Sequence, residues 1–256
     1  MNRSENRRRN KRRQQAGRNS APPAAGRQRL LDIAMQHHGA GRLAEAEQTY
    51  RQVLDSDPTD PPALHFLGVI AHQRGDGEAA VDLIETALRH APDDAEIELH
   101  LGIAYLGVDR LEDAARTFLN VLSALPNQAE AHHNLARVRE RQGQLDEAVA
   151  SYREAATAAP QSAELRISLG NALRRAERLE EAVASYREAL SIKPDSAVAY
   201  VNIGNTYGTM GRLDDAAASF RHAIALQPGF AQAHRHLSLV KKFRRYDDDV
   251  KAMEKQ

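Results

Sequence analysis

One pattern of 34 residues is written twice in succession, first as AELRISLGNALRRAERLEEAVASYREALSIKPDS (residues 163–196) and then as AVAYVNIGNTYGTMGRLDDAAASFRHAIALQPGF (residues 197–230). The two stretches share a glycine at the eighth position, an alanine at the twentieth, an aromatic residue at the twenty-fourth and a proline at the thirty-second. A fixed period of this length is typical of repeat proteins, in which each unit is one supersecondary element. The period therefore predicts the fold.

The same columns extend back toward the N-terminus without an insertion. Prolines recur every 34 residues, at Pro58, Pro92, Pro126, Pro160, Pro194 and Pro228. The alanine column holds Ala46, Ala80, Ala114, Ala148, Ala182 and Ala216. The small-residue column holds Ala34, Gly68, Gly102, Ala136, Gly170 and Gly204. The column of large residues holds Tyr50, Ile84, Phe118, Tyr152, Tyr186 and Phe220.

These columns have a physical interpretation as paired helices. Apolar residues recur at spacings of three and four, which indicates two amphipathic helices in each unit. The pattern breaks at a turn marked by Gly41, Gly75, Gly143 and Gly211. Small residues allow the two helices to cross closely, and each proline ends the second helix or opens the next unit. One hairpin cannot bury its apolar face alone, so we predict an all-α solenoid of six stacked units.

This pattern resembles the tetratricopeptide repeat, over residues 27–230 as six units, followed by a seventh first helix from Ala231 to about Arg245. Residues 231–256 would then form a capping helix and a short tail. The sequence departs from the family pattern where Ala71 and Arg139 replace a tyrosine and where Gly77 replaces a leucine. The resemblance implies a right-handed superhelix whose inner groove holds a polypeptide.

The resemblance also implies which side chains line that groove, namely one face of each first helix. In the last three units we expect a polar lining that contains Arg137, Arg141, Asn171, Arg174, Arg175, Asn202 and Asn205. Asparagine amides and arginine guanidiniums suit the backbone and the carboxylates of an extended peptide. In the first three units we expect a more apolar lining, with Leu31, Met35, His38, His65, Val69, His72, Leu99, Ile103 and Leu106. The alternative for each single residue is an ordinary solvated side chain.

The net charge of zero conceals a basic N-terminal arm on an acidic body. Residues 1–29 hold ten arginines or lysines and one acid, Glu5, so their net charge is +9. Residues 1–26 contain few apolar side chains, which predicts a disordered arm. Its basic cluster comprises Arg7, Arg8, Arg9, Lys11, Arg12 and Arg13. This cluster is either a solvated tail or a contact for nucleic acid or another anionic surface.

Composition and motifs narrow the classes of function. Cysteine is absent, which excludes disulfides and thiolate metal sites and suits the cytoplasm. No apolar run approaches the ~20 residues of a membrane span. No glycine-rich phosphate loop, no nucleophile elbow and no metalloprotease pair of histidines occurs, so we expect no catalysis, no cofactor and no metal site. The sequence predicts a scaffold that binds a protein or peptide, and it leaves the oligomeric state open.

The C-terminal residues suggest an alternative. After His234 the sequence HLSLVKKFRRYDDDVKAME (residues 236–254) looks like a helix, an aspartate-containing turn and a new helix. This arrangement is similar to the junction in bacterial proteins that join such repeats to a sulfotransferase domain. The chain would then be the substrate-recruiting part of a modifying enzyme, or a shortened relative of one.

Overall fold

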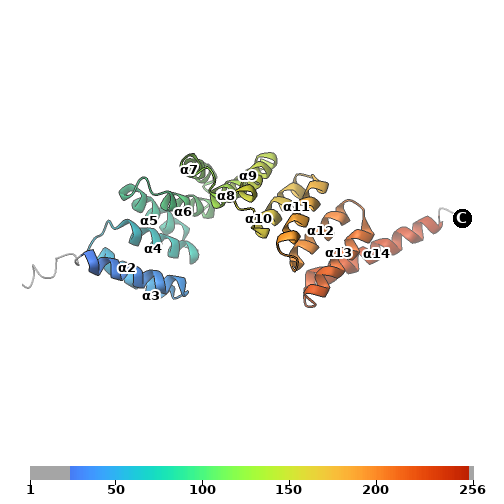
Figure 1. Cartoon of the computed structure of the whole chain (residues 1–256), viewed down its shortest axis with the longest axis horizontal. Helices are drawn as coiled ribbons and strands as arrows, with labels where there is room; N and C mark the ends of the chain where they lie inside the picture. Colours follow the sequence, from blue (N-terminus) through green and yellow to red (C-terminus); the bar gives the residue numbers. More distant parts are fainter. Residues whose placement is uncertain (1–23, 254–256) are drawn as a thin grey trace, which may run out of the picture. The chain divides into compact units, whose positions relative to one another are not determined.

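The computed structural model describes residues 24–253, together with the surroundings of the side chains from residue 25 to residue 242. Within residues 24–253 the chain forms thirteen α-helices and no strand (Figure 1). The predicted all-α architecture of helical hairpins is confirmed. The described part of the chain divides into two compact units, with the boundary between residues 121 and 122.

Each repeat is one hairpin of two consecutive helices. In the first unit the helices are α2 (Ala24–Gly39), α3 (Leu43–Leu54), α4 (Pro61–Gln73), α5 (Gly77–His90), α6 (Ala95–Gly107) and α7 (Leu111–Ala124), of which α7 ends just beyond the unit. In the second unit they are α8 (Ala129–Arg141), α9 (Leu145–Ala158), α10 (Ala163–Arg175), α11 (Leu179–Ile192), α12 (Ala197–Thr209), α13 (Leu213–Leu226) and α14 (Ala231–Met253).

The turn inside each hairpin requires a left-handed backbone. Gly41, Gly75, Gly143 and Gly211 have φ between 73° and 84°, a conformation that costs glycine little. At the same repeat position Asp109 and Glu177 have φ of 63° and 58° without the freedom of glycine. The hairpin geometry therefore imposes this conformation even where the residue type opposes it.

The connection between hairpins is set by a cap and a proline. In four repeats the residue before the first helix caps it. The side chains of Asp60, Asp94, Ser162 and Ser196 accept hydrogen bonds from backbone N–H groups in the first turn of that helix. Each proline of the 34-residue column, such as Pro194 between α11 and α12, lies in the loop after the second helix has ended. These prolines thus follow the second helix and do not open the next one.

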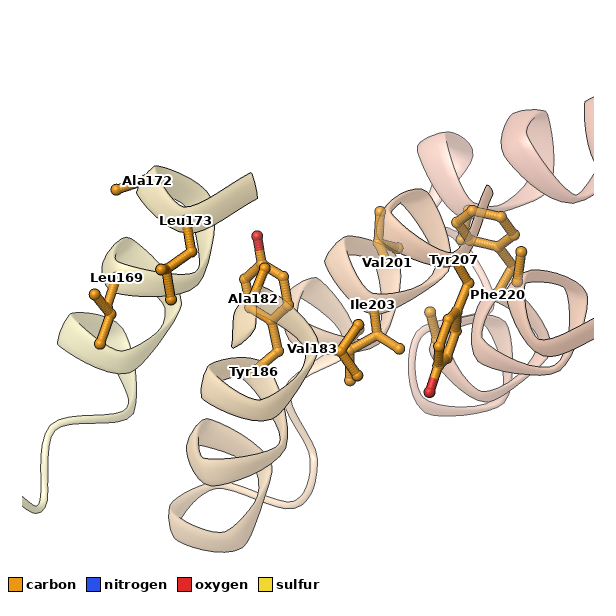
Figure 2. Close-up of a cluster of buried hydrophobic side chains, with 14 of the residues drawn as sticks. Leu169, Ala172, Leu173, Ala182, Val183, Tyr186, Val201, Ile203, Tyr207 and Phe220 are labelled. Carbon is orange, nitrogen blue, oxygen red and sulfur yellow. The ribbon is translucent and has the colours of Figure 1, made fainter. Parts of the chain in front are cut away.

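The core confirms the roles of the small and large columns. The alanines of the alanine column are fully buried, and the large column is at most 4% exposed. A Cβ on Gly102 would lie 2.6 Å from the Phe118 ring, and one on Gly204 would lie 2.6 Å from the Phe220 ring. Helices can approach this closely only where no side chain intervenes. Figure 2 shows the resulting cluster in the second unit, where rings from α11 and α13 pack against the first helix of the same hairpin.

Two expected boundaries differ from the structure. Helix α2 begins at Ala24, so residues 24–26 belong to the helix and not to the basic arm. Helix α14 continues to Met253, through the aspartates at 247–249 where a turn and a new helix were expected. Aspartate tolerates helical backbone at modest cost, about 0.5 kcal/mol relative to alanine, so three of them do not force a break.

Candidate functional site

All seven polar residues predicted to line a groove lie on the first helices of the second unit, α8, α10 and α12. Helix α10 contacts α12, and α12 contacts α14, so neighbouring first helices lie side by side. The three asparagines and Arg174 are half-buried, whereas the other three arginines are exposed. We call the surface formed by these seven residues the polar face.

The centre of the polar face is a pair of asparagines on adjacent helices. Asn202 on α12 donates from Nδ2 to Oδ1 of Asn171 on α10, at 3.2 Å. The same oxygen accepts a hydrogen bond of 2.8 Å from the hydroxyl of Tyr186. Two donors thus saturate the carbonyl oxygen of Asn171 and fix the orientation of both amides.

This orientation leaves complementary groups toward solvent. The Asn171 amide nitrogen and the Asn202 carbonyl oxygen have no hydrogen-bond partner among the described residues. Neither atom is buried, so both can be reached by solvent. One is a donor and the other an acceptor. An extended polypeptide backbone carries the complementary pair, a carbonyl oxygen and an N–H group.

The Tyr186 hydroxyl is the donor that orients the Asn171 amide. Burial raises the pKa of Tyr186 above its ordinary value of 10.0, while the neighbouring Arg174 guanidinium acts in the opposite direction. The hydroxyl therefore remains a neutral donor to Asn171. The Nε of Arg174 is buried and has no hydrogen-bond partner in the described part of the chain.

A second polar cluster lies one repeat earlier, around Glu140 on α8. Arg175 donates to Glu140 at 3.1 Å, and the Tyr152 hydroxyl donates to the other carboxylate oxygen at 3.0 Å. Burial raises the pKa of Tyr152, and the Glu140 charge raises it further. Glu140 thus holds Arg175 in place but also neutralises part of its charge.

Arg137, one turn away from Glu140, is oriented by its own helix. Its guanidinium donates to Oδ1 of Asn134 at 2.9 Å. Burial and then the charge of Arg137 lower the pKa of the neighbouring His133. The imidazole is therefore neutral near pH 7, and the positive charge here belongs to the arginine.

Asn205 has different surroundings, because the repeat pattern changes at the last hairpin. Phe220 occupies the column position of Tyr186, and His236 occupies that of Asn202, so Asn205 receives neither hydrogen bond that Asn171 receives. Asn205 instead lines a hollow of about 210 Å³ between α12, α13 and α14. Its walls are Gly204, Gly208, Leu213, Phe220, His236, Leu239 and Val240.

The hollow has an identifiable cause in the sequence. Gly208 takes the repeat position that Arg174 and Glu140 hold in the two preceding repeats. A Cβ on Gly208 would meet nothing within 4 Å. The Nδ1 atom of His236 is buried without a partner, and burial lowers its pKa. Asn205 and His236 are the polar groups in a mainly apolar site.

The structure thus brings some predicted residues together and separates others. Asn171 is bonded to both Asn202 and Tyr186, and Arg174 neighbours the Tyr186 hydroxyl. Arg137 and Arg175 instead donate to Asn134 and Glu140. Arg141 is exposed at the end of α8. The sequence interpretation treated Tyr186 only as a packing residue. The mixture of tyrosine and phenylalanine in its column was the available sign that its hydroxyl has a polar role.

In the first unit the expected apolar lining is partly wrong. Leu31, Leu99 and Leu106 are at most 4% exposed, so they belong to the core and cannot contact a ligand. Met35, at 43% exposed, is accessible. His65 is also buried, with its Nε2 2.9 Å from Nδ1 of His100 on the next first helix.

The basic cluster from Arg7 to Arg13 lies outside the described residues, so its contact with an anionic surface stays a prediction. Within residues 24–253, no helix combines the length and the apolar character that crossing a bilayer requires.

Comparison with known protein families accounts for most of the chain. Models described as tetratricopeptide repeat match residues 37–98, 99–163 and 197–230, and one described as TPR repeat matches residues 170–211. The chain belongs to the tetratricopeptide repeat family. Repeat proteins of this family generally bind other proteins and do not catalyse reactions, and the matched models all describe the repeat. They lend no support to the expected sulfotransferase junction.

Solved structures show the same fold at low sequence identity. A chain of the APC/C heterotetramer Cut9–Hcn1 matches with 16% identity and a TM-score of 0.66, over 82% of this tetratricopeptide repeat chain and 42% of that chain. PilF of Pseudomonas aeruginosa matches with 16% identity and a TM-score of 0.69, over 83% and 96% of the two chains. YrrB, described as a TPR protein with an unusual peptide-binding site, matches with 20% identity and a TM-score of 0.58, over 73% and 96%. No curated protein sequence matches the chain.

Proposed function

We propose that this chain is a scaffold that holds an extended polypeptide segment against the polar face of its second unit, without catalysis. The observation that carries the proposal is the amide pair of Asn171 and Asn202. The Tyr186 hydroxyl and the bond between the two amides leave one donor and one acceptor toward solvent. A peptide backbone supplies the matching acceptor and donor, whatever its side chains.

Charge on the same face favours a segment with acidic side chains. Arg137, Arg141 and Arg175 are exposed, and Arg174 is half-buried beside Tyr186. Guanidiniums bind carboxylates with charge-assisted hydrogen bonds, which are stronger than neutral ones. Glu140 pairs with Arg175, whereas Arg137 donates to the neutral amide of Asn134 and keeps its full charge for a ligand.

The hollow beside Gly208 adds a place for an apolar side chain of the same segment. It is open to solvent and lined by Leu213, Phe220 and Leu239, of which Leu239 is 48% exposed. The amide of Asn205 lies at its edge and has no described side-chain partner, so it is available to the peptide backbone. YrrB, a TPR protein with an unusual peptide-binding site, has a similar fold and is compatible with this function. The absence of cysteine leads us to propose the cytoplasm as its location.

The test is affinity capture with the full chain, followed by titration of the captured segment as a synthetic peptide. The triple variant Asn171→Ala, Arg174→Ala, Asn205→Ala should weaken peptide binding at least tenfold, because each change removes a group that faces the peptide. Its helicity should be unchanged. Mass spectrometry of the peptide after incubation should show no change in mass.

A matched control places three alanines elsewhere on the same unit. Glu154, Lys193 and Arg221 are exposed and lie outside the polar face, on α9, after α11 and on α13. Their triple alanine variant should bind as the parent chain does. Equal affinity in both triple variants would remove the polar face as the binding site.

A further inference from the structure

The first unit contains a hollow that no part of the proposed function uses. It lies between α3, α4 and α5 and has a volume of about 280 Å³. Its walls are apolar, formed by Leu54, Leu67, Ile70, Ala71, Ala79 and Leu83. Its rim is charged, formed by Glu47, Arg51, Arg74 and Asp76. An apolar cavity of about 150 Å³ is enough to hold benzene, so this hollow has room for an aromatic ring.

Two small residues create the hollow. Ala71 stands at the repeat position that holds Tyr105 in the next repeat and Tyr207 in the last repeat. Ala79 stands at a position that is acidic in the other five repeats, at Glu45, Asp113, Glu147, Glu181 and Asp215. The second repeat thus lacks both a ring and the carboxylate that accompanies it elsewhere.

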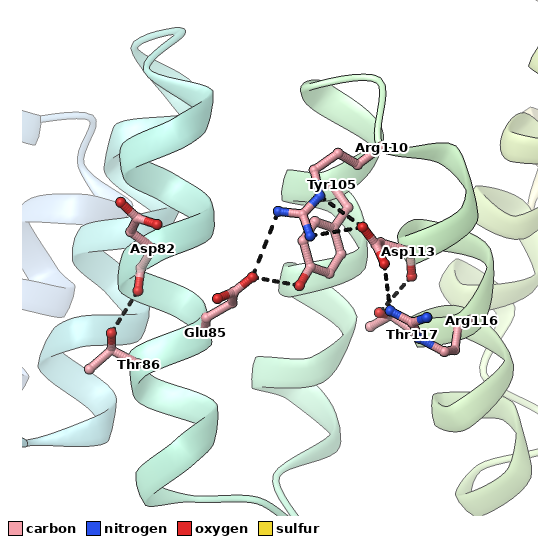
Figure 3. A network of polar contacts seen from close by, with 8 residues as sticks. All are labelled: Asp82, Glu85, Thr86, Tyr105, Arg110, Asp113, Arg116 and Thr117. Atoms are coloured by element: carbon pink, nitrogen blue, oxygen red, sulfur yellow. Dashed lines mark hydrogen bonds and ion pairs between the residues drawn. The ribbon is translucent and has the colours of Figure 1, made fainter.

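The repeat that follows shows this place filled by a tyrosine ring (Figure 3). The Tyr105 hydroxyl donates to Glu85 on α5 at 2.7 Å. The Arg110 guanidinium covers the ring at 4.3 Å from its centroid and pairs with Asp113 at 2.8 Å. Glu85, Arg110 and Asp113 correspond by repeat position to Arg51, Asp76 and Ala79, all of which line the hollow. The hollow is therefore the vacant counterpart of the Tyr105 site.

In the last repeat the corresponding place is filled by the Tyr207 ring, whose hydroxyl accepts a hydrogen bond instead of donating one. Arg187, which corresponds to Arg51, donates to the Tyr207 hydroxyl at 2.7 Å. Arg212 covers that ring at 4.4 Å from its centroid. A phenol hydroxyl can both donate and accept, so it suits either a carboxylate or a guanidinium at this position.

The rim of the hollow offers both kinds of partner. Glu47 pairs with Arg51 at 2.6 Å and also with Arg74. The position of Glu47 is apolar in the other repeats, which hold Val81, Ala115, Val149, Val183 and Ala217 there. The rim carries two acids and two arginines, so its formal charges cancel. Such a rim complements a neutral hydroxyl and not a charged head group.

We propose that this hollow binds the phenol ring of a tyrosine presented by a partner polypeptide. The ring would lie against Ile70, Ala71 and Leu83, and its hydroxyl would meet Arg51 and Glu47. A polypeptide is the proposed source because both filled examples, Tyr105 and Tyr207, are rings carried on a backbone beside the same elements. The proposal concerns the first unit only and does not depend on the polar face of the second.

The test is a titration of the full chain with N-acetyl-L-tyrosinamide, followed in amide ¹H–¹⁵N correlation spectra. Saturable shifts are expected at Ala71 and Ala79, with a dissociation constant on the order of 1 mM, as suits one buried ring. N-acetyl-L-phenylalaninamide lacks the hydroxyl and should bind about fivefold more weakly. Shifts that do not saturate, or equal affinity for the two amides, would overturn the proposal.

Variants decide whether the ring enters the hollow. Ala71→Tyr supplies the ring within the chain, so it should abolish the shifts and raise the melting temperature. Ala79→Leu narrows the hollow from the other side and should also abolish binding, whereas Ala71→Ser leaves the space open and should retain it. Persistence of saturable binding in both Ala71→Tyr and Ala79→Leu would place the ligand elsewhere and reject the site.

Discussion

The ring of Tyr186 lies against the backbone of Gly170, where a Cβ would come within 2.5 Å of the ring atom Cε1. The same ring carries the hydroxyl that fixes Asn171, the next residue on α10. Tyr186 therefore both packs α11 against α10 and orients an amide of the proposed site. The close approach of α11 to α10 brings the hydroxyl of a core residue to the edge of the polar face.

Replacing Gly170 with alanine should destabilise the chain, because the added methyl group overlaps the Tyr186 ring. Overpacking of this kind costs about 1–3 kcal/mol. Gly208 is the matched control, since it lies in α12 with nothing within 4 Å of an added Cβ. Gly208→Ala should be neutral or stabilising by up to about 1 kcal/mol. Urea unfolding of both variants measures the difference, and equal midpoints would contradict the packing account.

The sequence predicts the hairpins well because the recurring residue types are those that the packing of every repeat requires. Gly170 is small because Tyr186 crosses it, and Ala182 is fully buried in the core. These requirements recur every 34 residues, so six copies reinforce each other. The turn at Glu177 shows the limit, because its left-handed φ of 58° follows from its place in the repeat and not from its residue type.

The candidate site is less predictable because it depends on contacts between repeats. Asn171 and Asn202 were expected in one groove, but their mutual hydrogen bond depends on the spacing of α10 and α12. Leu99 was expected at the groove and is buried, since a helix face does not show which neighbour covers it. Ala71 was noted only as a departure from the family pattern. The resulting hollow requires that Ala79, on the adjoining helix, is small as well.

Glu177→Gly should stabilise the chain. Glu177 is exposed, so its side chain contributes little to the free energy of folding. Its φ of 58° strains the backbone. Left-handed backbone costs a non-glycine residue about 1–2 kcal/mol, and glycine recovers part of this cost. We expect a rise of about 1 kcal/mol in the free energy of unfolding. Gly143→Ala reverses the change at the same repeat position and should be destabilising, and a lower melting temperature for Glu177→Gly would contradict the strain argument.

Tyr186→Phe should weaken peptide binding with little change of fold, since Phe220 already occupies this column position. The variant removes the 2.8 Å hydrogen bond to Asn171, so the longer 3.2 Å bond from Asn202 alone holds its carbonyl oxygen. Loss of one such bond is worth about 1 kcal/mol, or about fivefold in affinity. Tyr152→Phe is the control, because its hydroxyl meets Glu140, which Arg175 still holds. Fluorescence anisotropy with the captured peptide should show a larger loss for Tyr186→Phe, and equal losses would contradict the role of Tyr186.

His65 should make the first unit sensitive to acid. Burial, and then the nearby His100, lower the pKa of His65 to about 4, while Asp94 acts in the opposite direction and His38 adds a smaller decrease. The folded chain binds fewer protons here than the unfolded chain, so this residue costs no stability above about pH 6.5 and costs progressively more as the pH falls toward 4. The full penalty is on the order of 3 kcal/mol. His65→Gln removes the titrating group, so the fall in melting temperature between pH 7 and pH 5 should be smaller in the variant than in the parent chain. An identical fall in the two proteins would show that other groups, such as the carboxylates of the helix caps, govern acid unfolding.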